Sequence, residues 1–448
     1  MSVSPARAVA FDILLRVEEQ DAYASELLHS ERCADLSPLD QSLATELVMG
    51  VLRWRSTIDD AIAAVSVQNL ARLDPEVLTA LRVGAYQLGW LDRVPARAAL
   101  YESVELVKRA RKRSAAPFAN AILHKLADRP DRIHGHEQTL LAIADPPSIA
   151  KTSAHPLWLV ERWAEQFGIE VAARISASDQ ELPVTSIRLR DSTAEAELRA
   201  ESIELAPGAL LTSARRILAG DVSKTKPYRD GRIAIQDEAS QLVAALVGKG
   251  SRILDCCAAP GGKTWSIADR NPDATVVAVE LHARRAELVR KRVAAAHVQV
   301  ITGDIRELPT RDLFDRVLVD VPCSGTGTIA RNPEIKWRLR PEDLADLRAR
   351  QMQILQAAAR HLAPGGKLVY STCSLEREED ESVLQDVLNL DSSLRLLDAK
   401  SELEQLQSAG ELAANFSPES AVHGSYLRTI PGVQPTDGFF VAMLRKEV

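Results

Sequence analysis

Two short stretches of the sequence each place a cysteine directly after a strand-like apolar run. Residues 319–327 read VDVPCSGTG and contain Cys323, and residues 370–374 read YSTCS and contain Cys373. A single cysteine is more often a small buried apolar residue than a nucleophile, but both of these thiols stand beside polar residues at predicted strand ends. A thiolate can attack an electron-poor ring. The pair therefore indicates a covalent transferase.

A third stretch, residues 253–264, reads ILDCCAAPGGKT and predicts a strand, a tight glycine turn and a helix. The free N–H groups at the start of such a helix can hold an anionic or adenosine-bearing cofactor. A phosphate-binding P-loop does not fit, because Cys257 stands where that motif needs its first glycine. The dinucleotide fingerprint Gly-x-Gly-x-x-Gly is also absent, which argues against an NAD-dependent dehydrogenase.

Acidic residues stand at the ends of the next two predicted strands. Glu280 ends one strand and Asp304 follows the other. This arrangement suits S-adenosylmethionine, with Glu280 at the ribose hydroxyls, Asp304 near the adenine and the turn backbone around the methionyl part. The alternative is a βαβ unit whose acids only cap helices. The expected cofactor contacts are Cys257, Ala258, Ala259, Pro260, Gly261, Gly262, Lys263, Glu280, Asp304 and Asp320.

Alternating strands and helices in the last 200 residues position these groups. Strands are predicted at 252–256, 275–280, 298–302, 316–320 and 367–371, and helices at 283–296 and 343–361. This pattern is typical of an open, doubly wound sheet, in which ligands bind at the carboxyl ends of the strands. We therefore expect a Rossmann-like α/β domain over 246–448.

The chain before this domain is divided into two further regions. Apolar spacing predicts a helical bundle over 1–130, and a connector rich in proline and glycine over 127–153 leads to a small α/β module over 150–245. The bundle includes a basic run at 108–113, with five positive charges in six residues. This run fits either RNA phosphate contact or a solvated helix end, and the pattern leaves both open.

Composition excludes several classes of protein. The 448 residues are 46% hydrophobic and 26% charged, as in soluble globular proteins, and no apolar run reaches the ~18 residues of a membrane span. The five cysteines include no Cys-x-x-Cys pair, so we expect neither a disulfide framework nor a metal site. The net charge of −7 calls for a localised basic groove if nucleic acid is bound. We expect a cytosolic protein whose RNA-contact tract is Arg331, Lys336, Trp337, Arg338 and Arg340.

These motifs resemble those of the Nop/Sun family of RNA cytosine-5 methyltransferases. The resemblance lies in residues 255–264, in 320–327 with the trailing 331–337, and in 371–374. The first 130 residues resemble the NusB-type RNA-binding domain that is fused to bacterial 16S rRNA methyltransferases of this family. Further landmarks are 155–163, 236–240 and 437–440. The implied fold is a class I methyltransferase domain preceded by an all-α NusB-like domain and a small α/β connecting module.

The chain departs from the family pattern at two places and leaves a third segment open. Cys256 adds a second thiol beside Cys257, residues 434–436 read QPT where family members often have a histidine, and 391–427 has no assignable role.

The resemblance also implies a mechanism and a substrate. Cys373 would add to C6 of a cytosine so that C5 accepts the methyl group, Cys323 would serve release of the C5 proton, and Asp320 would contact N3 and the exocyclic amine. Lys263 would lie between cofactor and base. The expected partner is a single-stranded or flipped cytosine of 16S rRNA, bound by a monomer. A tRNA or another rRNA site, and a non-catalytic RNA-binding assembly factor, stay as alternatives, although intact thiols argue against the latter.

Overall fold

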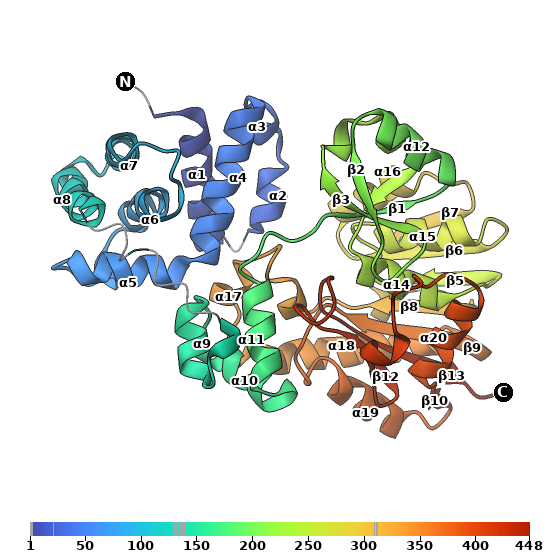
Figure 1. Cartoon of the computed structure of the whole chain (residues 1–448). Coiled ribbons are helices and arrows are strands. Elements are labelled where there is room, and N and C mark those ends of the chain that lie inside the picture. The colour runs from blue at the N-terminus through green and yellow to red at the C-terminus, as the bar shows by residue number, and fades with distance from the viewer. Residues whose placement is uncertain (1–2, 21, 129–132, 134–139, 309, 311) are drawn as a thin grey trace. The chain divides into compact units, whose positions relative to one another are not determined.

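The chain folds into two compact units in the computed structural model (Figure 1). Residues 3–20, 22–128, 133, 140–308, 310 and 312–448 are described. One unit contains Met1–Pro183 with Ile329–Leu339, and the other contains Val184–Thr328 with Arg340–Val448. The connector predicted over 127–153 lies partly outside the described residues. In the described part of the chain, no helix has both the length and the apolar character needed to cross a membrane.

The first unit is helical throughout its described residues. Its helices are α1 (Pro5–Gln20), α2 (Ala24–Leu28), α3 (Glu31–Ala34), α4 (Pro38–Arg53), α5 (Arg55–Val65), α6 (Pro75–Trp90), α7 (Ala96–Arg109), α8 (Ala116–Ala127), α9 (Pro146–Thr152), α10 (Leu157–Phe167), α11 (Ile169–Ser178) and α17 (Ile335–Arg338). Sequence signals set several starts: Asp74 precedes the first-turn proline of α6, and Ser37 Oγ accepts from the Asp40 N–H at the start of α4. The apolar faces of α1 and α4–α8 close around one core.

Ion pairs occupy part of the basic run 108–113, which begins in the last turn of α7. Lys108 pairs with Glu105 at 2.6 Å, and Arg109 pairs with Asp12 at 3.2 Å. Lys112 pairs with Asp74, at the start of α6, at 3.1 Å. These pairs are at least one-third exposed on the basic side, so they are weak and can exchange for phosphate contacts. The two interpretations of this run therefore both stay predictions.

The tract predicted to contact RNA folds into the first unit except for Arg340, which belongs to the second. Lys336 is fully buried in α17, and its Nζ donates to the backbone oxygens of Arg53 and Ala154 at 2.9 Å each. Trp337 Nε1 donates to the Leu52 oxygen at 2.6 Å. The last carbonyls of α4 have no hydrogen-bond donors within their helix. Lys336 and Trp337 supply donors to two of these carbonyls. Burial lowers the pKa of Lys336 to about 7. Lys336 is therefore buried away from the RNA contact predicted for it.

A small antiparallel sheet opens the second unit, with strand order β2-β3-β1-β4. Its strands are β1 (Ser186–Leu189), β2 (Glu204–Pro207), β3 (Ala214–Ala219) and β4 (Ile233–Ile235), with helices α12 (Ser192–Ala200) and α13 (Lys226–Arg229). This sheet has its own apolar cluster around Ile187 and Leu198. Helices α9–α11, which precede it, belong to the first unit. The three domains predicted over 1–130, 150–245 and 246–448 stay a proposal, because the structure divides the chain into two units.

The larger sheet has strand order β11-β12-β13-β9-β8-β5-β6-β7, with β10 paired to β13. Its strands are β5 (Arg252–Asp255), β6 (Thr275–Glu280), β7 (Val298–Thr302), β8 (Phe314–Asp320), β9 (Leu362–Thr372), β10 (Leu394–Leu396), β11 (Val422–His423), β12 (Tyr426–Thr429) and β13 (Phe439–Lys446). The five strands from β5 to β9 are parallel, and β13 runs antiparallel to β9. The predicted Rossmann-like fold is confirmed.

Alternation along the strands builds a core on each face of this sheet. Ile253 lies in the cluster with α14 (Glu238–Val247), α15 (Gly262–Arg270), α16 (Ala283–Val293) and α20 (Ala399–Ser408). The next residue, Leu254, lies in the cluster with α18 (Asp343–Arg360) and α19 (Glu381–Leu390). Successive side chains of a strand point to opposite faces, so both faces are covered and the strand ends remain as the open edge.

Candidate active site at the carboxyl ends of the strands

Cys323 and Cys373 are in direct contact. Their strands, β8 and β9, are parallel neighbours whose last paired residues are Asp320 and Ser371, so the two loops leave the sheet at the same edge. The two Sγ atoms lie 3.2 Å apart, and the Cys373 N–H also points to the Cys323 Sγ at 3.3 Å. The hydrogen bond to Cys373, with burial, raises the pKa of the Cys323 thiol well above its ordinary value. The protonated form of Cys323 is therefore favoured, and it can donate to Cys373.

The backbone behind the thiols is held by two glycines. The Gly327 N–H donates to the Cys373 oxygen at 2.9 Å, and the Gly438 N–H donates to the Gly327 oxygen at 2.7 Å. A Cβ on Gly327 would lie 2.3 Å from the Gly438 oxygen. Only a residue without a side chain fits this approach, which locks the Cys323 loop to the Cys373 loop.

Asp320 and Lys263 form an ion pair beside the thiols. Asp320 ends β8, and its Oδ2 accepts from Lys263 Nζ at 2.8 Å while its Oδ1 accepts from Ser371 Oγ at 2.7 Å. Burial alone would lower the pKa of Lys263, but Asp320, with smaller contributions from Cys373 and Asp255, outweighs it and raises the pKa. Lys263 is therefore a stable cation in the field of the Cys373 thiol.

The glycine turn joins β5 to α15 as predicted. Gly261 takes φ 96° at the start of the helix, a conformation that favours glycine. The Glu280 carboxylate, at the end of β6, accepts the Ala259 N–H at 3.3 Å and the His282 N–H at 3.0 Å. The structure thus brings Glu280 against the turn.

Asp304 is engaged differently. Its two oxygens accept from the Arg306 guanidinium, with contacts of 2.5–3.0 Å, and its Oδ1 also accepts the Arg306 N–H at 2.9 Å. The hydrogen bond from Arg306 lowers the pKa of Asp304. The carboxylate caps the short helix η6 (Ile305–Glu307). Helix capping, the alternative considered for the acids, therefore describes the contacts of Asp304.

Cys256 and Cys257 come directly after β5; Cys256 is buried and Cys257 is half-buried. Burial raises the pKa of each well above its ordinary value. Cys256 is 2% exposed and lies in an apolar cluster, as expected of a packing residue. In the described residues, no group of three or more His, Cys, Asp or Glu side chains is arranged to hold a metal ion.

Several residues at this edge were not predicted from the sequence. Asp255 ends β5, is 1% exposed and accepts from Thr264 Oγ1 at 2.6 Å; burial raises its pKa to about 6. The position of Asp255, at a strand end just before the glycine turn, could have indicated from the sequence that it belongs to the site. Glu379 contacts both cysteine loops, but it lies in the acidic stretch 376–381, which is typical of an exposed helix start.

Comparison with known proteins follows the division of the chain. A family described as 16S rRNA methyltransferase RsmB/F matches residues 245–445, and the NusB family matches residues 4–128. A probable ribosomal RNA small subunit methyltransferase B of Bacillus subtilis is 32% identical and covers 100% of both chains. A ribosomal RNA small subunit methyltransferase B of Vibrio cholerae is 31% identical, covering 98% of this chain and 97% of its own.

Solved structures share the fold. The protein PH0851 matches 100% of both chains with a TM-score of 0.78 and 23% identity. A methyltransferase homolog protein from Pyrococcus horikoshii covers 67% of this chain and 98% of its own, with a TM-score of 0.54 and 25% identity. The fold of this chain is therefore one already seen in other proteins.

Proposed function

Because the chain belongs to the RsmB/F family of 16S rRNA methyltransferases, we propose that it transfers a methyl group from S-adenosylmethionine to C5 of a cytosine in 16S rRNA. The 3.2 Å contact between the Cys323 and Cys373 sulfur atoms supports this proposal most directly. Two thiols that meet at the ends of adjacent strands can act on one ring, whereas a protein that only binds RNA needs neither.

The residues around the glycine turn fit the cofactor. Each Glu280 oxygen accepts one backbone N–H, and a carboxylate oxygen has room for a second donor, so two ribose hydroxyls can be held. Asp304 can take the adenine amine after Arg306, which is 39% exposed, releases one oxygen. The remaining contacts fall on Cys257, Ala258, Ala259, Pro260, Gly261, Gly262, Lys263 and Asp320. When bound, S-adenosylmethionine supplies an electrophilic methyl group.

Cys373 is the nucleophile in this proposal. Its thiolate forms a bond from Sγ to C6, and the C5–C6 electron pair makes C5 nucleophilic toward the methyl group. The C5 proton then leaves, the C5–C6 double bond forms again, and the bond from C6 to Sγ breaks to return the Cys373 thiolate. Cys323, whose protonated form is favoured in the free protein, serves this release either as the group that positions the base or, once it has given up its own proton, as the base that takes the C5 proton.

The ion pair of Lys263 and Asp320 supplies the charge that the addition needs. The Lys263 cation, which interacts with Cys373, can balance the negative charge that passes from the Cys373 sulfur to the ring. Asp320 can accept from the exocyclic amine of the ring, and from N3 once that nitrogen carries a proton. These bonds favour the charge that develops on the ring during thiolate addition.

The RNA must present an unstacked base, since the ring of a stacked cytosine cannot be reached by Cys373. The proposed substrate is therefore a single-stranded or flipped cytosine. The NusB-family match over residues 4–128 supports RNA contact by the first unit.

The test is transfer of label from tritiated S-adenosylmethionine to unmodified 16S rRNA, with Cys373→Ala as the inactive control. We expect label on C5 of cytosine after digestion of the native reaction and none with the variant. Label on another base, or on another position of cytosine, would refute the chemistry. Label on tRNA alone would keep the chemistry and change the substrate.

A further inference from the structure

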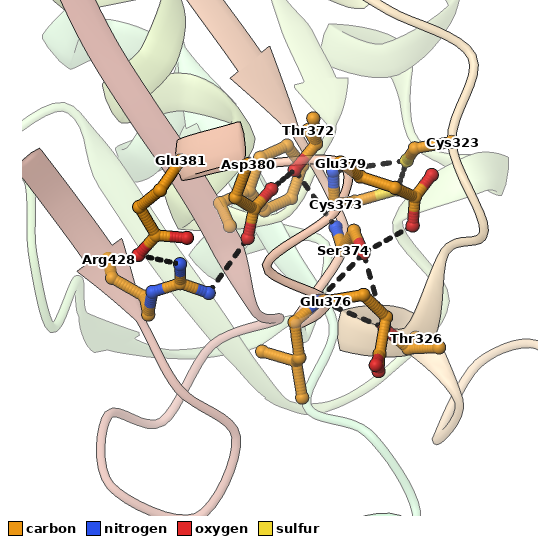
Figure 2. A network of polar contacts seen from close by, with 12 residues as sticks. Cys323, Thr326, Thr372, Cys373, Ser374, Glu376, Glu379, Asp380, Glu381 and Arg428 are labelled. Atoms are coloured by element: carbon orange, nitrogen blue, oxygen red, sulfur yellow. Dashed lines mark hydrogen bonds and ion pairs between the residues drawn. The ribbon is translucent and has the colours of Figure 1, made fainter. Parts of the chain in front are cut away.

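A buried carboxylate joins the two cysteine loops. Glu379 is 0% exposed, and Figure 2 shows its side chain between Cys323 and Ser374. Its Oε1 accepts the backbone N–H of Ser324, the residue after Cys323, at 2.8 Å. Its Oε2 accepts from Ser374 Oγ, on the residue after Cys373, at 2.6 Å. One side chain therefore holds the residues that follow both thiols.

A glutamine extends this anchor to the other side of Cys323. Gln351 Nε2 donates to Glu379 Oε1 at 2.8 Å and to the Pro322 oxygen at 2.9 Å. The hydroxyls of Ser324 and Ser374 also lie 3.0 Å apart. Both neighbours of Cys323 are thus tied to the carboxylate, one directly and one through Gln351.

Asp380, the residue after Glu379, anchors the other side of Cys373. Asp380 Oδ1 accepts from Thr372 Oγ1 at 2.6 Å, and its Oδ2 pairs with Arg428 at 2.8 Å (Figure 2). Thr372 comes directly before Cys373 and Ser374 directly after it. Consecutive acids therefore hold the two neighbours of Cys373 from the α19 side.

The negative charge of Glu379 is supported by hydrogen bonds. Within the described residues, no lysine or arginine forms an ion pair with it, and its donors are one backbone N–H, one amide and one hydroxyl. A buried charge without a counter-ion is costly unless such donors are fixed in place. The need to satisfy this charge therefore holds the donors, and with them both loops, in one geometry. The same charge contributes to the raised pKa of Cys323.

We infer that Glu379 is a positioning residue for the proposed reaction, whose carboxylate sets the separation of the Cys323 and Cys373 sulfur atoms. The inference rests on the proposed function. Both thiols lie beyond the last paired residues of β8 and β9, so the strand ladder does not fix their spacing. A misplacement of about 1 Å at a reacting group can cost about 100-fold in rate.

The kinetic test compares Glu379→Gln with a matched buried glutamate of the same unit. Glu238 is also 0% exposed and accepts three backbone N–H groups, from Ala209, Leu210 and Leu211, at 2.8–3.3 Å. In single-turnover methyl transfer to 16S rRNA, we expect Glu379→Gln to be at least tenfold slower with its dissociation constants for cofactor and RNA within twofold of native. Glu238→Gln should retain the native rate. A native rate in Glu379→Gln, or an equal loss in both variants, would overturn the inference.

A double mutant tests whether Glu379 acts through Ser374. If it does, Glu379→Gln combined with Ser374→Ala should be no slower than the slower single variant, because each change removes the same contact. Multiplied losses would show that the two side chains act independently and would contradict the role assigned to the Glu379 Oε2 contact.

Amide hydrogen exchange tests the anchor without any methyl transfer. In Glu379→Ala, the peptide containing Ser324 should exchange at least tenfold faster than in the native protein, and in Glu238→Ala the peptide containing residues 209–211 should do so instead. Unchanged exchange at Ser324 in a folded Glu379→Ala protein would overturn the inference. Failure of native protein to methylate RNA would refute the proposed function but would leave this readout intact.

Discussion

Replacing Gly327 by alanine should displace the loop that carries Cys323. The added Cβ would lie 2.3 Å from the Gly438 oxygen and 2.7 Å from its carbonyl carbon, and both are backbone atoms that cannot turn away. An ordinary contact begins at 3.4 Å, so the two backbones must separate by about 1.1 Å. That movement would stretch two hydrogen bonds. One runs from the Gly327 N–H to the Cys373 oxygen, and the other from the Gly438 N–H to the Gly327 oxygen.

The displacement has two measurable costs. Overpacking of this kind destabilises by about 1–3 kcal/mol, and at about 2–4 °C per kcal/mol for a unit of this size the melting temperature should fall by about 2–12 °C. A shift of about 1 Å between the thiols should also slow methyl transfer about 100-fold. The loss of rate should therefore greatly exceed what partial unfolding explains at a temperature where the variant is folded.

The assay combines thermal unfolding with single-turnover transfer to 16S rRNA. Gly303→Ala is the control for stability, because a Cβ at Gly303 meets nothing within 4 Å and its φ is not positive. We expect that variant to melt within a degree or so of the native protein. If Gly327→Ala melts and reacts like the native protein, the loop is not locked as described and the reasoning fails.

Three further changes test single groups at the same edge. The pKa of Asp255 in the folded protein, about 6, lies above the ordinary 3.8. The contribution of Asp255 to the free energy of unfolding is therefore fully present below the lower value, and about 3 kcal/mol is lost as pH rises through the higher one. Urea unfolding of Asp255→Asn should lack this fall, and an identical pH dependence in both proteins would contradict the prediction. Lys263→Met leaves Asp320 without its cation and should lower the free energy of unfolding by about 1–3 kcal/mol; an unchanged urea midpoint would refute this. Glu280→Ala should weaken binding of S-adenosylmethionine about tenfold in calorimetric titration, and native affinity would exclude the ribose contact.

Much of the second unit could be predicted from the sequence, because its parallel strands other than the edge strand β7 contain buried apolar runs. The predicted strands at 275–280 and 298–302 match β6 and β7. The predicted helix at 343–361 matches α18 to within a residue. The two cysteine motifs also stood at strand ends, where the open-sheet rule locates ligands.

Other features depend on contacts between distant parts of the chain. Arg428 of β12 pairs with Asp380, and it lies just past the segment 391–427, to which the sequence assigned no role. Lys336 lies in a charged stretch, and its burial is explained by two distant backbone oxygens, those of Arg53 and Ala154. Spacing along the chain contains no signal for either contact, since the partners are separated by 48 and 283 residues in sequence.

Formation of a covalent protein–RNA adduct tests the central claim most directly. Native protein, Cys323→Ala, Cys373→Ala and the double variant would each be incubated with S-adenosylmethionine and unmodified 16S rRNA, denatured, and separated by electrophoresis. The proposal predicts an adduct that survives denaturation in Cys323→Ala, is linked through Cys373 in the digested protein, and is absent whenever Cys373 is alanine. Methylated cytosine produced by Cys373→Ala, or an adduct linked through any other residue, would contradict the account.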